Sequence, residues 1–256
     1  MTEFKNIRIE TINGVANVTL DRPKHNVLNL SMMDELSTAM EQLASETALK
    51  CVVIYGKGPS WCAGVEVVDH KPDMVHNMIP GFNRIFFSMD KIEIPIIAAV
   101  NGFCLGGGME VAIACDMIVA TKSAFFGQPE IKLGFFPPYA AFRLPQLVGP
   151  AKAIEICTTG KRYTAESFRS MGLVTSVADD DKLRSEVDKL LGEITACSPL
   201  IIRLNKRAVK KHLGMGLTEG IERISDLFLN TLMKTQDTLE GIAGFEEKRR
   251  PVWKNR

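Results

Sequence analysis

The sequence lacks the patterns by which metal sites and nucleic-acid sites are usually first noticed. Among its 256 residues there are only four histidines, in no H-E-x-x-H or similar spacing, and six cysteines without a C-x-x-C pair. A structural or catalytic metal is therefore not expected. The 31 basic and 30 acidic residues give a net charge of +1, which argues against nucleic acid or an anionic membrane as the main partner.

Long hydrophobic runs and targeting signals are also missing. No apolar stretch reaches the roughly 18 residues of a membrane-spanning helix. Residues 1–6 carry no charged segment followed by an apolar one, and the last residues are not a Ser-Lys-Leu address, so we expect a cytoplasmic protein. In that compartment the six cysteines should be reduced and buried. What the chain does have is the composition of one ordinary globular core, with 46% hydrophobic and 24% charged residues.

In the first half of the chain, strand and helix patterns alternate. Residues 7–20 predict two strands joined by an Asn13-Gly14 turn, and a helix follows that Ser31 is expected to cap. Short apolar strands are predicted at 51–55, 95–100 and 117–120, with a helix over 73–89. Strands that are apolar on both faces and alternate with helices indicate an α/β fold with a buried sheet.

Helical patterns dominate after about Gly149. They cover six segments, at 152–157, 165–171, 182–196, 199–213, 217–235 and 238–249. We place the core at residues 1–195 and a helical C-terminal region at 196–256.

The most unusual segment is the glycine-rich stretch at 101–110, which includes Gly106, Gly107 and Gly108. Three glycines between a strand and a helix leave backbone N–H groups free at a helix N-terminus, where they can stabilise a phosphate or an oxyanion. The segment matches neither a P-loop nor G-x-G-x-x-G. On its own it is equally well explained as a close packing turn.

A second loop, at 61–66, also follows a strand. Gly64 allows a close backbone approach, so the N–H of Val65 could point into the same pocket as the glycine-rich segment. Two N–H donors from separate strand ends are what an oxyanion hole for a thioester or an ester requires.

Two carboxylates lie close to these loops in the sequence. Glu110 follows Gly107 by three residues and should project from the first turn of the helix, while Glu130 follows Pro129, which should hold the chain extended. Paired carboxylates in different environments can divide acid and base roles. A single glutamate is more often a solvated surface charge.

Together these residues resemble the crotonase, or enoyl-CoA hydratase/isomerase, superfamily. The resemblance rests on Asn-Gly-x-x-x-Gly-Gly-Gly-x-Glu at 101–110 and Phe-Gly-Gln-Pro-Glu at 126–130, and it extends from Ala63-Gly64 to the Gly-Phe-Glu-Glu-Lys-Arg stretch at 244–249. It implies a spiral of ββα units over residues 1–195, followed by a helical trimerisation region. It also implies acyl-CoA thioesters as substrates, a homotrimer or a dimer of trimers, and no cofactor, because CoA is part of the substrate.

The resemblance also implies roles for single residues. Val65 and Gly107 match the two oxyanion-hole donors, and Glu110 and Glu130 match the two catalytic glutamates of the hydratases. The implied CoA contacts, often supplied in part by a neighbouring subunit, are Ala63, Phe228, Phe245 and Lys248.

Among the reactions of this superfamily, the presence of both glutamates favours the addition or elimination of water. An isomerase usually carries its acid in the segment that here spans 133–139, and that segment has none. Its bulky residues Phe135, Phe136 and Tyr139 instead resemble cyclohexa-1,5-diene-1-carbonyl-CoA hydratases of anaerobic benzoyl-CoA degradation, where they would surround a flat cyclic acyl group. These aromatic residues could equally pack the core or a subunit interface.

The mechanism expected from this resemblance uses Glu110 as the base and Glu130 as the acid, although the reverse assignment stays open. Three alternatives remain: a general short-chain enoyl-CoA hydratase, an isomerase or hydrolase of the same fold, and a protein that binds acyl-CoA without catalysis. A basic face near Lys206, Arg207, Lys210 and Lys211 is better explained as a solvated helix face than as a nucleic-acid site.

Overall fold

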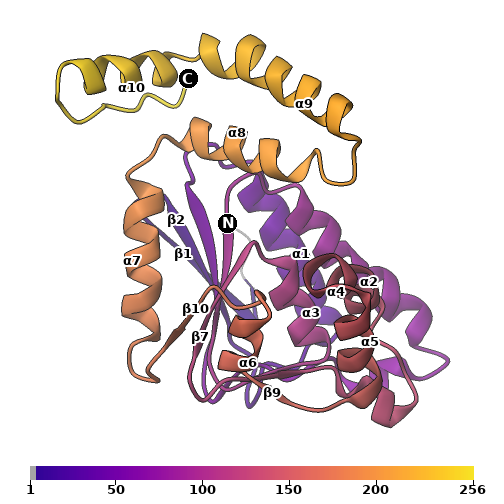
Figure 1. Ribbon diagram of the computed structural model, residues 1–256. Coiled ribbons are helices and arrows are strands. Elements are labelled where there is room, and N and C mark those ends of the chain that lie inside the picture. The colour runs from indigo at the N-terminus through magenta and orange to yellow at the C-terminus, as the bar shows by residue number, and fades with distance from the viewer. Residues whose placement is uncertain (1–3) are drawn as a thin grey trace.

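The computed structural model describes residues 4–256 and contains two β-sheets with helices packed around them (Figure 1). The predicted absence of a secretory signal concerns in part residues 1–3, which lie outside the described residues. Within residues 4–256, no helix is both long and apolar enough to cross a membrane.

The larger sheet has six strands in the order β1-β2-β3-β5-β7-β10. Strands β1 and β2 form the predicted antiparallel hairpin, and the remaining neighbours pair in parallel. Asn13 and Gly14 occupy the turn with φ of 51° and 79°, as an Asn-Gly hairpin turn requires. The strand bounds are β1 (Ile7–Ile12), β2 (Val15–Leu20), β3 (Cys51–Gly56), β5 (Ile96–Val100), β7 (Met117–Thr121) and β10 (Ser176–Ala178).

Both faces of this sheet are buried along its central strands β3, β5 and β7, which explains why these strands are apolar without alternation, whereas the edge strand β1 keeps exposed polar residues. In β3, Val52 and Ile54 belong to the main core, whereas Cys51 and Val53 pack in a second cluster with Val187 of helix α7 (Leu183–Thr195). Because successive side chains of a strand point to opposite faces, a strand covered on both sides needs apolar residues at every position. The predicted α/β class is confirmed.

The smaller sheet consists of four short strands in the order β4-β6-β8-β9, where β4, β6 and β8 run parallel. Their bounds are β4 (Ser60–Cys62), β6 (Phe103–Leu105), β8 (Phe125–Gly127) and β9 (Tyr163–Thr164). Strands of two or three residues carry no readable periodicity, and the sequence did not predict this sheet as a unit. The parallel orientation brings the carboxyl ends of β4, β6 and β8 to one edge.

Most helices agree with the predicted segments except in detail, but α4 (Pro138–Val148) was not predicted. Helix α1 is capped by Asn29 and not by Ser31, because the Asn29 side-chain oxygen accepts from the Met32 N–H at 3.0 Å. The bounds are α1 (Leu30–Ala44), α2 (Val75–Asp90), α3 (Gly107–Ala114), α4 (Pro138–Val148), α5 (Pro150–Thr159), α6 (Ala165–Ser170), α7 (Leu183–Thr195), α8 (Pro199–Lys210), α9 (Leu217–Asp226) and α10 (Gln236–Glu246).

The C-terminal helices α9 and α10 lie beyond α8 and extend away from the sheets (Figure 1). Asp237 fixes α10, since its buried carboxylate accepts from Ser198 Oγ and from the N–H groups of Lys254 and Asn255 at 2.7 and 2.9 Å. The prediction that helices dominate after Gly149 is only partly right, because β10 lies beyond that residue and pairs in the large sheet. The division at residue 195 coincides with the end of α7 and stays a prediction.

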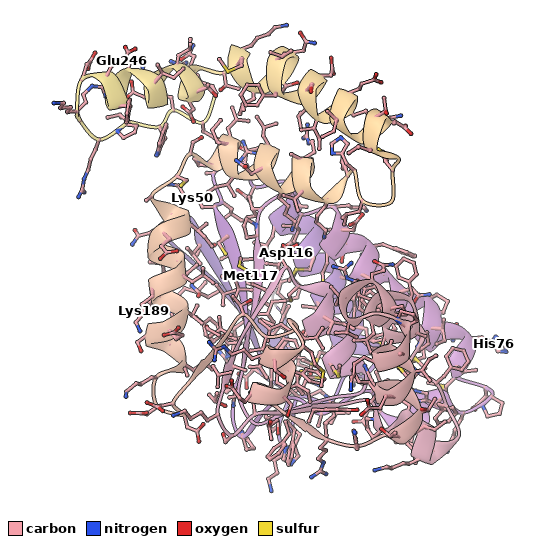
Figure 2. All side chains as sticks on the ribbon, viewed as in Figure 1. Lys50, His76, Asp116, Met117, Lys189 and Glu246 are labelled. Atoms are coloured by element: carbon pink, nitrogen blue, oxygen red, sulfur yellow. The ribbon has the colours of Figure 1, made fainter. Side chains whose placement is uncertain are left out.

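The basic residues of α8 are largely paired with acids of the core. Lys206 Nζ lies 2.6 Å from Oδ2 of Asp116, which sits beneath α8 (Figure 2), and Arg207 binds Glu93 at 2.7 Å. Lys210 Nζ is 3.5 Å from the second oxygen of Asp116. These pairs tie α8 to the sheet, so its charges are not a free basic patch.

Candidate functional site

A cavity of about 340 Å³ lies at the edge where the short parallel strands end. Ala63 follows β4, Gly106 follows β6 and Glu130 comes shortly after β8, and all three line the cavity. Ligand sites in parallel sheets lie outside the carboxyl ends of the strands. The three segments that the sequence singled out therefore meet where a ligand site is expected.

The two predicted N–H donors lie close together in this cavity. Val65 and Gly107 both line it, and a Cβ at Gly107 would lie only 2.5 Å from Cγ2 of Val65. Gly107 is the first residue of α3, where the N–H has no partner inside the helix. Among residues 4–256 neither N–H has a hydrogen-bond acceptor. Both are thus available to an oxygen of a ligand.

Gly106 allows the second carboxylate to approach these donors. It caps α3 in the left-handed region with φ of 54°, and a Cβ there would stand 2.8 Å from Oε1 of Glu130. Any side chain at residue 106 would strain the backbone and displace the glutamate.

Glu110 projects from the first turn of α3, as predicted, and its side chain is only 2% exposed. Oε1 accepts from the N–H of Ala140, near the start of α4, at 2.8 Å. Burial raises the pKa of Glu110, the Ala140 N–H opposes the shift by stabilising the carboxylate, and the charge of Glu130 adds to the rise, with a net pKa of about 8.

Glu130 stands in a different local structure from the one predicted. Pro129 does not hold the chain extended there; it opens a 3₁₀-helix, Pro129–Leu133, in whose first turn Glu130 lies. The fully buried Gln128 amide, oriented with its nitrogen toward Glu130, donates to Oε1 and Oε2 at 3.0 and 3.1 Å. Burial raises the pKa of Glu130 to about 7.

Of the three aromatic residues predicted to surround the acyl group, two line the cavity, and their contact with an acyl group stays a prediction. Phe135 and Phe136 line the cavity. Tyr139 is not among the described residues that line it; its ring stacks on Phe86 at 3.7 Å and turns toward a separate surface depression beside α8. Tyr139 is the second residue of α4, and its ring faces α2, which carries Phe86.

Residues that the sequence did not single out complete the cavity wall. Four of them come from α2, namely Val75, Met78, Ile79 and Phe82, and His70 joins them from the 3₁₀-helix Val67–His70. Helical spacing predicts a buried face on α2, but it does not show that part of this face borders a cavity instead of the core. Nothing in the sequence around His70 assigned a role to this histidine.

The proposed CoA contacts are divided between two regions. Ala63 lines the cavity, whereas Phe228, Phe245 and Lys248 lie on the extended C-terminal part and do not line it. Phe245 is 87% exposed. A single chain therefore does not bring these three residues to the site, and their role stays a prediction that requires a neighbouring chain.

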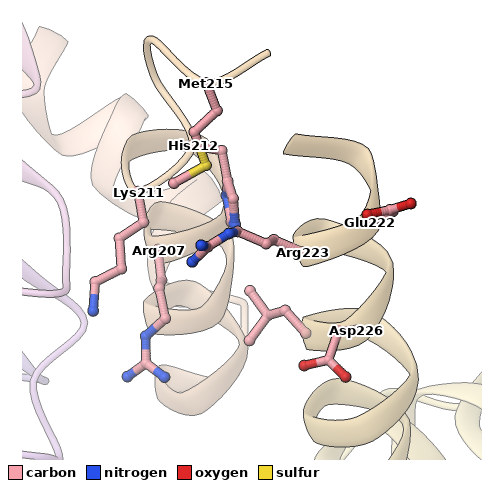
Figure 3. Close-up of a pocket in the computed structure, with 8 residues that line it drawn as sticks. Arg207, Lys211, His212, Met215, Glu222, Arg223 and Asp226 are labelled. Carbon is pink, nitrogen blue, oxygen red and sulfur yellow. The ribbon is translucent and has the colours of Figure 1, made fainter. Parts of the chain in front are cut away.

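A second depression, of about 480 Å³, lies between α8 and α9 (Figure 3). It is lined by charged side chains, but Arg207 is bound to Glu93 and Arg223 is 2.9 Å from Glu219. It contains neither the two glutamates nor the free N–H groups. We therefore place the candidate active site in the cavity at the strand ends.

The cysteines and histidines do not form a metal centre in the described part of the chain, where no three His, Cys, Asp or Glu side chains are arranged to hold an ion. Cys51, Cys62, Cys104 and Cys115 are buried as predicted, while Cys157 is half-buried and Cys197 is exposed, contrary to prediction. Burial raises the pKa of the Cys62 thiol to about 12, so this neighbour of the site is unreactive.

Comparison with known proteins gives consistent matches over nearly the whole chain. A model of the enoyl-CoA hydratase/isomerase family matches residues 10–256. A Dictyostelium discoideum protein named "Probable enoyl-CoA hydratase, mitochondrial" is 36% identical over 245 residues, covering 93% of this chain and 87% of its own. A crystal structure of enoyl-CoA hydratase from Bacillus anthracis is 29% identical, covers 98% of this chain and 100% of its own, and has a TM-score of 0.91.

The predicted cyclic substrate appears in the name of one relative. Cyclohexa-1,5-dienecarbonyl-CoA hydratase of Thauera aromatica is 31% identical over 250 residues and covers 97% of this chain and 96% of its own. This identity is lower than the 36% of the Dictyostelium discoideum relative, whose name specifies only enoyl-CoA. The resemblance is thus confirmed for the superfamily and its fold, but not for the cyclohexadiene branch.

Proposed function

Because the chain belongs to the enoyl-CoA hydratase/isomerase family, we propose that it adds water across the conjugated double bond of an unsaturated acyl-CoA thioester. The observation that carries this proposal is the pairing of buried Glu110 and half-buried Glu130 beside two free backbone N–H groups in one cavity. A protein that only binds acyl-CoA has no need for such a pair of carboxylates.

In the proposed mechanism the thioester oxygen accepts hydrogen bonds from the N–H groups of Val65 and Gly107, which stabilise the enolate charge that develops during attack. Loss of one such donor typically lowers the rate by about 10²–10³-fold. Ionised Glu110 takes a proton from water as the water oxygen bonds to the β-carbon. Protonated Glu130 then gives its proton to the α-carbon, and the thioester has gained one water.

The raised pKa values favour a pair of carboxyl groups that shares one proton near neutral pH. Because the pKa of Glu110 is the higher of the two, the shared proton lies on Glu110 in the unliganded site, which favours the reverse division of roles. With pKa values of about 8 and about 7, one carboxyl is protonated and the other ionised over a narrow range between them. The assignment of the base to Glu110 and the acid to Glu130 stays a prediction.

For the acyl group, the relatives favour a general enoyl-CoA substrate, and we take it as the first candidate. The cyclic dienoyl thioester is the second, supported by the aromatic wall of Phe135 and Phe136 and by the Thauera aromatica relative. A role in aromatic degradation depends on this second candidate.

The test is incubation of the purified chain with crotonyl-CoA and with cyclohexa-1,5-diene-1-carbonyl-CoA. Hydration is followed by loss of the conjugated thioester absorbance and by a mass gain of one water. A preference for crotonyl-CoA supports the first candidate and the opposite preference supports the second. Conversion without a change in thioester mass indicates an isomerase, and release of free CoA indicates a hydrolase. Binding without turnover overturns the proposal of an enzyme.

We also propose that the extended C-terminal part mediates a homotrimer or a dimer of trimers, in which a neighbouring chain supplies Phe228, Phe245 and Lys248 to the CoA site. Light scattering measures the assembly directly. If trimers form, mixing chains inactivated at Glu110 with chains altered at Phe245 and Lys248 should restore sites that either parent lacks.

A further inference from the structure

His70 is the exception in an otherwise apolar wall. Among the described residues that line the cavity, only His70, Glu110 and Glu130 carry polar side chains, and the proposed mechanism uses the two glutamates. The remaining lining side chains are aliphatic, aromatic or proline. A polar group in such a wall fixes the orientation of a ligand and provides specificity.

The surroundings of His70 fix both the ring and its tautomer. Nδ1 lies 3.0 Å from the backbone carbonyl oxygen of Glu66, which can only accept, so Nδ1 carries the hydrogen. The ring packs against Phe135 with the centroids 4.9 Å apart. In the neutral imidazole this leaves Nε2 as an acceptor, and no described residue bonds to it.

We propose that His70 is a specificity-determining residue, whose Nε2 accepts a hydrogen bond from a hydroxyl group on the acyl part of the thioester. The favoured substrates are then unsaturated acyl-CoA thioesters that carry a hydroxyl remote from the carbonyl. This inference rests on the proposed function, which it narrows to a substrate class.

The physical reason is the fate of the water on Nε2 when the cavity fills. His70 is partly exposed, so water solvates Nε2 in the empty cavity. An alkyl chain displaces that water and leaves the acceptor without a partner, whereas a hydroxyl replaces the lost hydrogen bond. A site with such a polar group discriminates against the analogue that lacks the hydroxyl by more than an apolar pocket does, and we expect at least about 10-fold.

The experiment compares 4-hydroxybut-2-enoyl-, 5-hydroxypent-2-enoyl- and 6-hydroxyhex-2-enoyl-CoA with their parents of the same chain length. The kcat/KM of each is measured for the unaltered protein and for His70→Phe, which keeps an aromatic ring beside Phe135 and removes both nitrogens. His70→Gln retains a polar acceptor. His76→Phe is the matched control, because His76 is exposed at the periphery of the molecule (Figure 2).

The unaltered protein and His76→Phe should prefer at least one hydroxylated thioester by about 10-fold or more. His70→Phe should reverse this preference, by slowing the hydroxylated substrate and improving its parent, and His70→Gln should retain part of it. A purely structural histidine would instead lower every kcat/KM by one factor. That result, or the absence of any preference in the unaltered protein, overturns the inference while leaving the proposed function intact.

Binding separates failure of the inference from failure of the proposed function. Calorimetric titration with the saturated pair 6-hydroxyhexanoyl-CoA and hexanoyl-CoA, and with the shorter pairs, requires no hydration. If no thioester is hydrated, the proposed function fails. The role of His70 is then still supported by a binding preference for the hydroxylated ligand that His70→Phe removes, and overturned if that preference is absent or unchanged.

Discussion

The buried carboxyl of Glu110 should make the protein less stable as the pH rises, and Glu110→Gln should remove this effect. In the folded chain the pKa of Glu110 is about 8, compared with its ordinary value of 4.5 in the unfolded chain. Between these values the unfolded chain has released the proton and the folded chain still holds it. Unfolding therefore releases a proton, and stability falls with rising pH until it levels off above about pH 8.

The size of the effect follows from the two pKa values. Each pKa unit corresponds to about 1.4 kcal/mol. A pKa raised from 4.5 to about 8 then lowers the free energy of unfolding by roughly 4 kcal/mol between pH 5 and pH 9. Glutamine is nearly isosteric, and its side-chain oxygen can still accept from the Ala140 N–H, so the variant keeps the contact and loses only the titration.

Urea unfolding at pH 5, 7 and 9 measures this difference directly. Relative to the unaltered protein, Glu110→Gln should gain stability steadily from pH 5 to pH 9, while its hydratase activity is lost. Glu46→Gln, which changes an exposed carboxylate just after the end of α1, provides the control. If the two proteins differ by the same free energy at all three pH values, burial does not raise the pKa of Glu110 and the acid–base argument loses its basis.

Further predictions concern the pH optimum, the glycine loop and a helix cap. The kcat/KM should follow a narrow bell-shaped pH profile, rising as one carboxyl ionises near pH 7 and falling as the second ionises near pH 8. A profile that is flat from pH 6 to pH 9 would contradict the idea that the two carboxyl groups share one proton. Gly107→Ala places a Cβ 2.5 Å from Val65 and should lower kcat/KM by about 100-fold or more, whereas Gly192→Ala, with open space around it, should have no effect in the same assay. Asn29→Ala should lower the free energy of unfolding in urea by about 1 kcal/mol through loss of the α1 cap, with kcat unchanged. An unchanged free energy of unfolding would mean that Asn29 does not cap α1.

Much of the site could be predicted because its chemistry depends on glycines and acids at fixed spacing. Gly106 and Gly107 are needed where a side chain would collide with Glu130 and Val65, and such positions are visible in a sequence. The apolar strands were likewise predictable, since burial on both faces leaves no polar alternation to misread. The cavity wall was less accessible: Phe82 and Met78 obey the helical spacing of any buried face, and only the fold decides that they border a cavity.

The predictions for the cap of α1 and for the local structure at Pro129 were wrong for a similar reason: the sequence allows two local structures at each place. Ser31 and Asn29 are both good capping residues, and the position at which α1 begins decides between them. Pro129 is compatible with an extended chain and with the first position of a helix, and the packing of Glu130 against Gly106 accompanies the second. The direction of Tyr139 depends on the start of α4, which carried no capping signal in the sequence.

The hydrogen bond from the Ala140 N–H to Glu110 joins two properties that are usually considered separately. Ala140 belongs to the same short stretch of chain as Phe135 and Phe136, which form part of the wall against which an acyl group would lie. Any change that reshapes this stretch for a new acyl group also moves a donor that lowers the pKa of Glu110. In this protein, substrate range and pH profile should therefore evolve together.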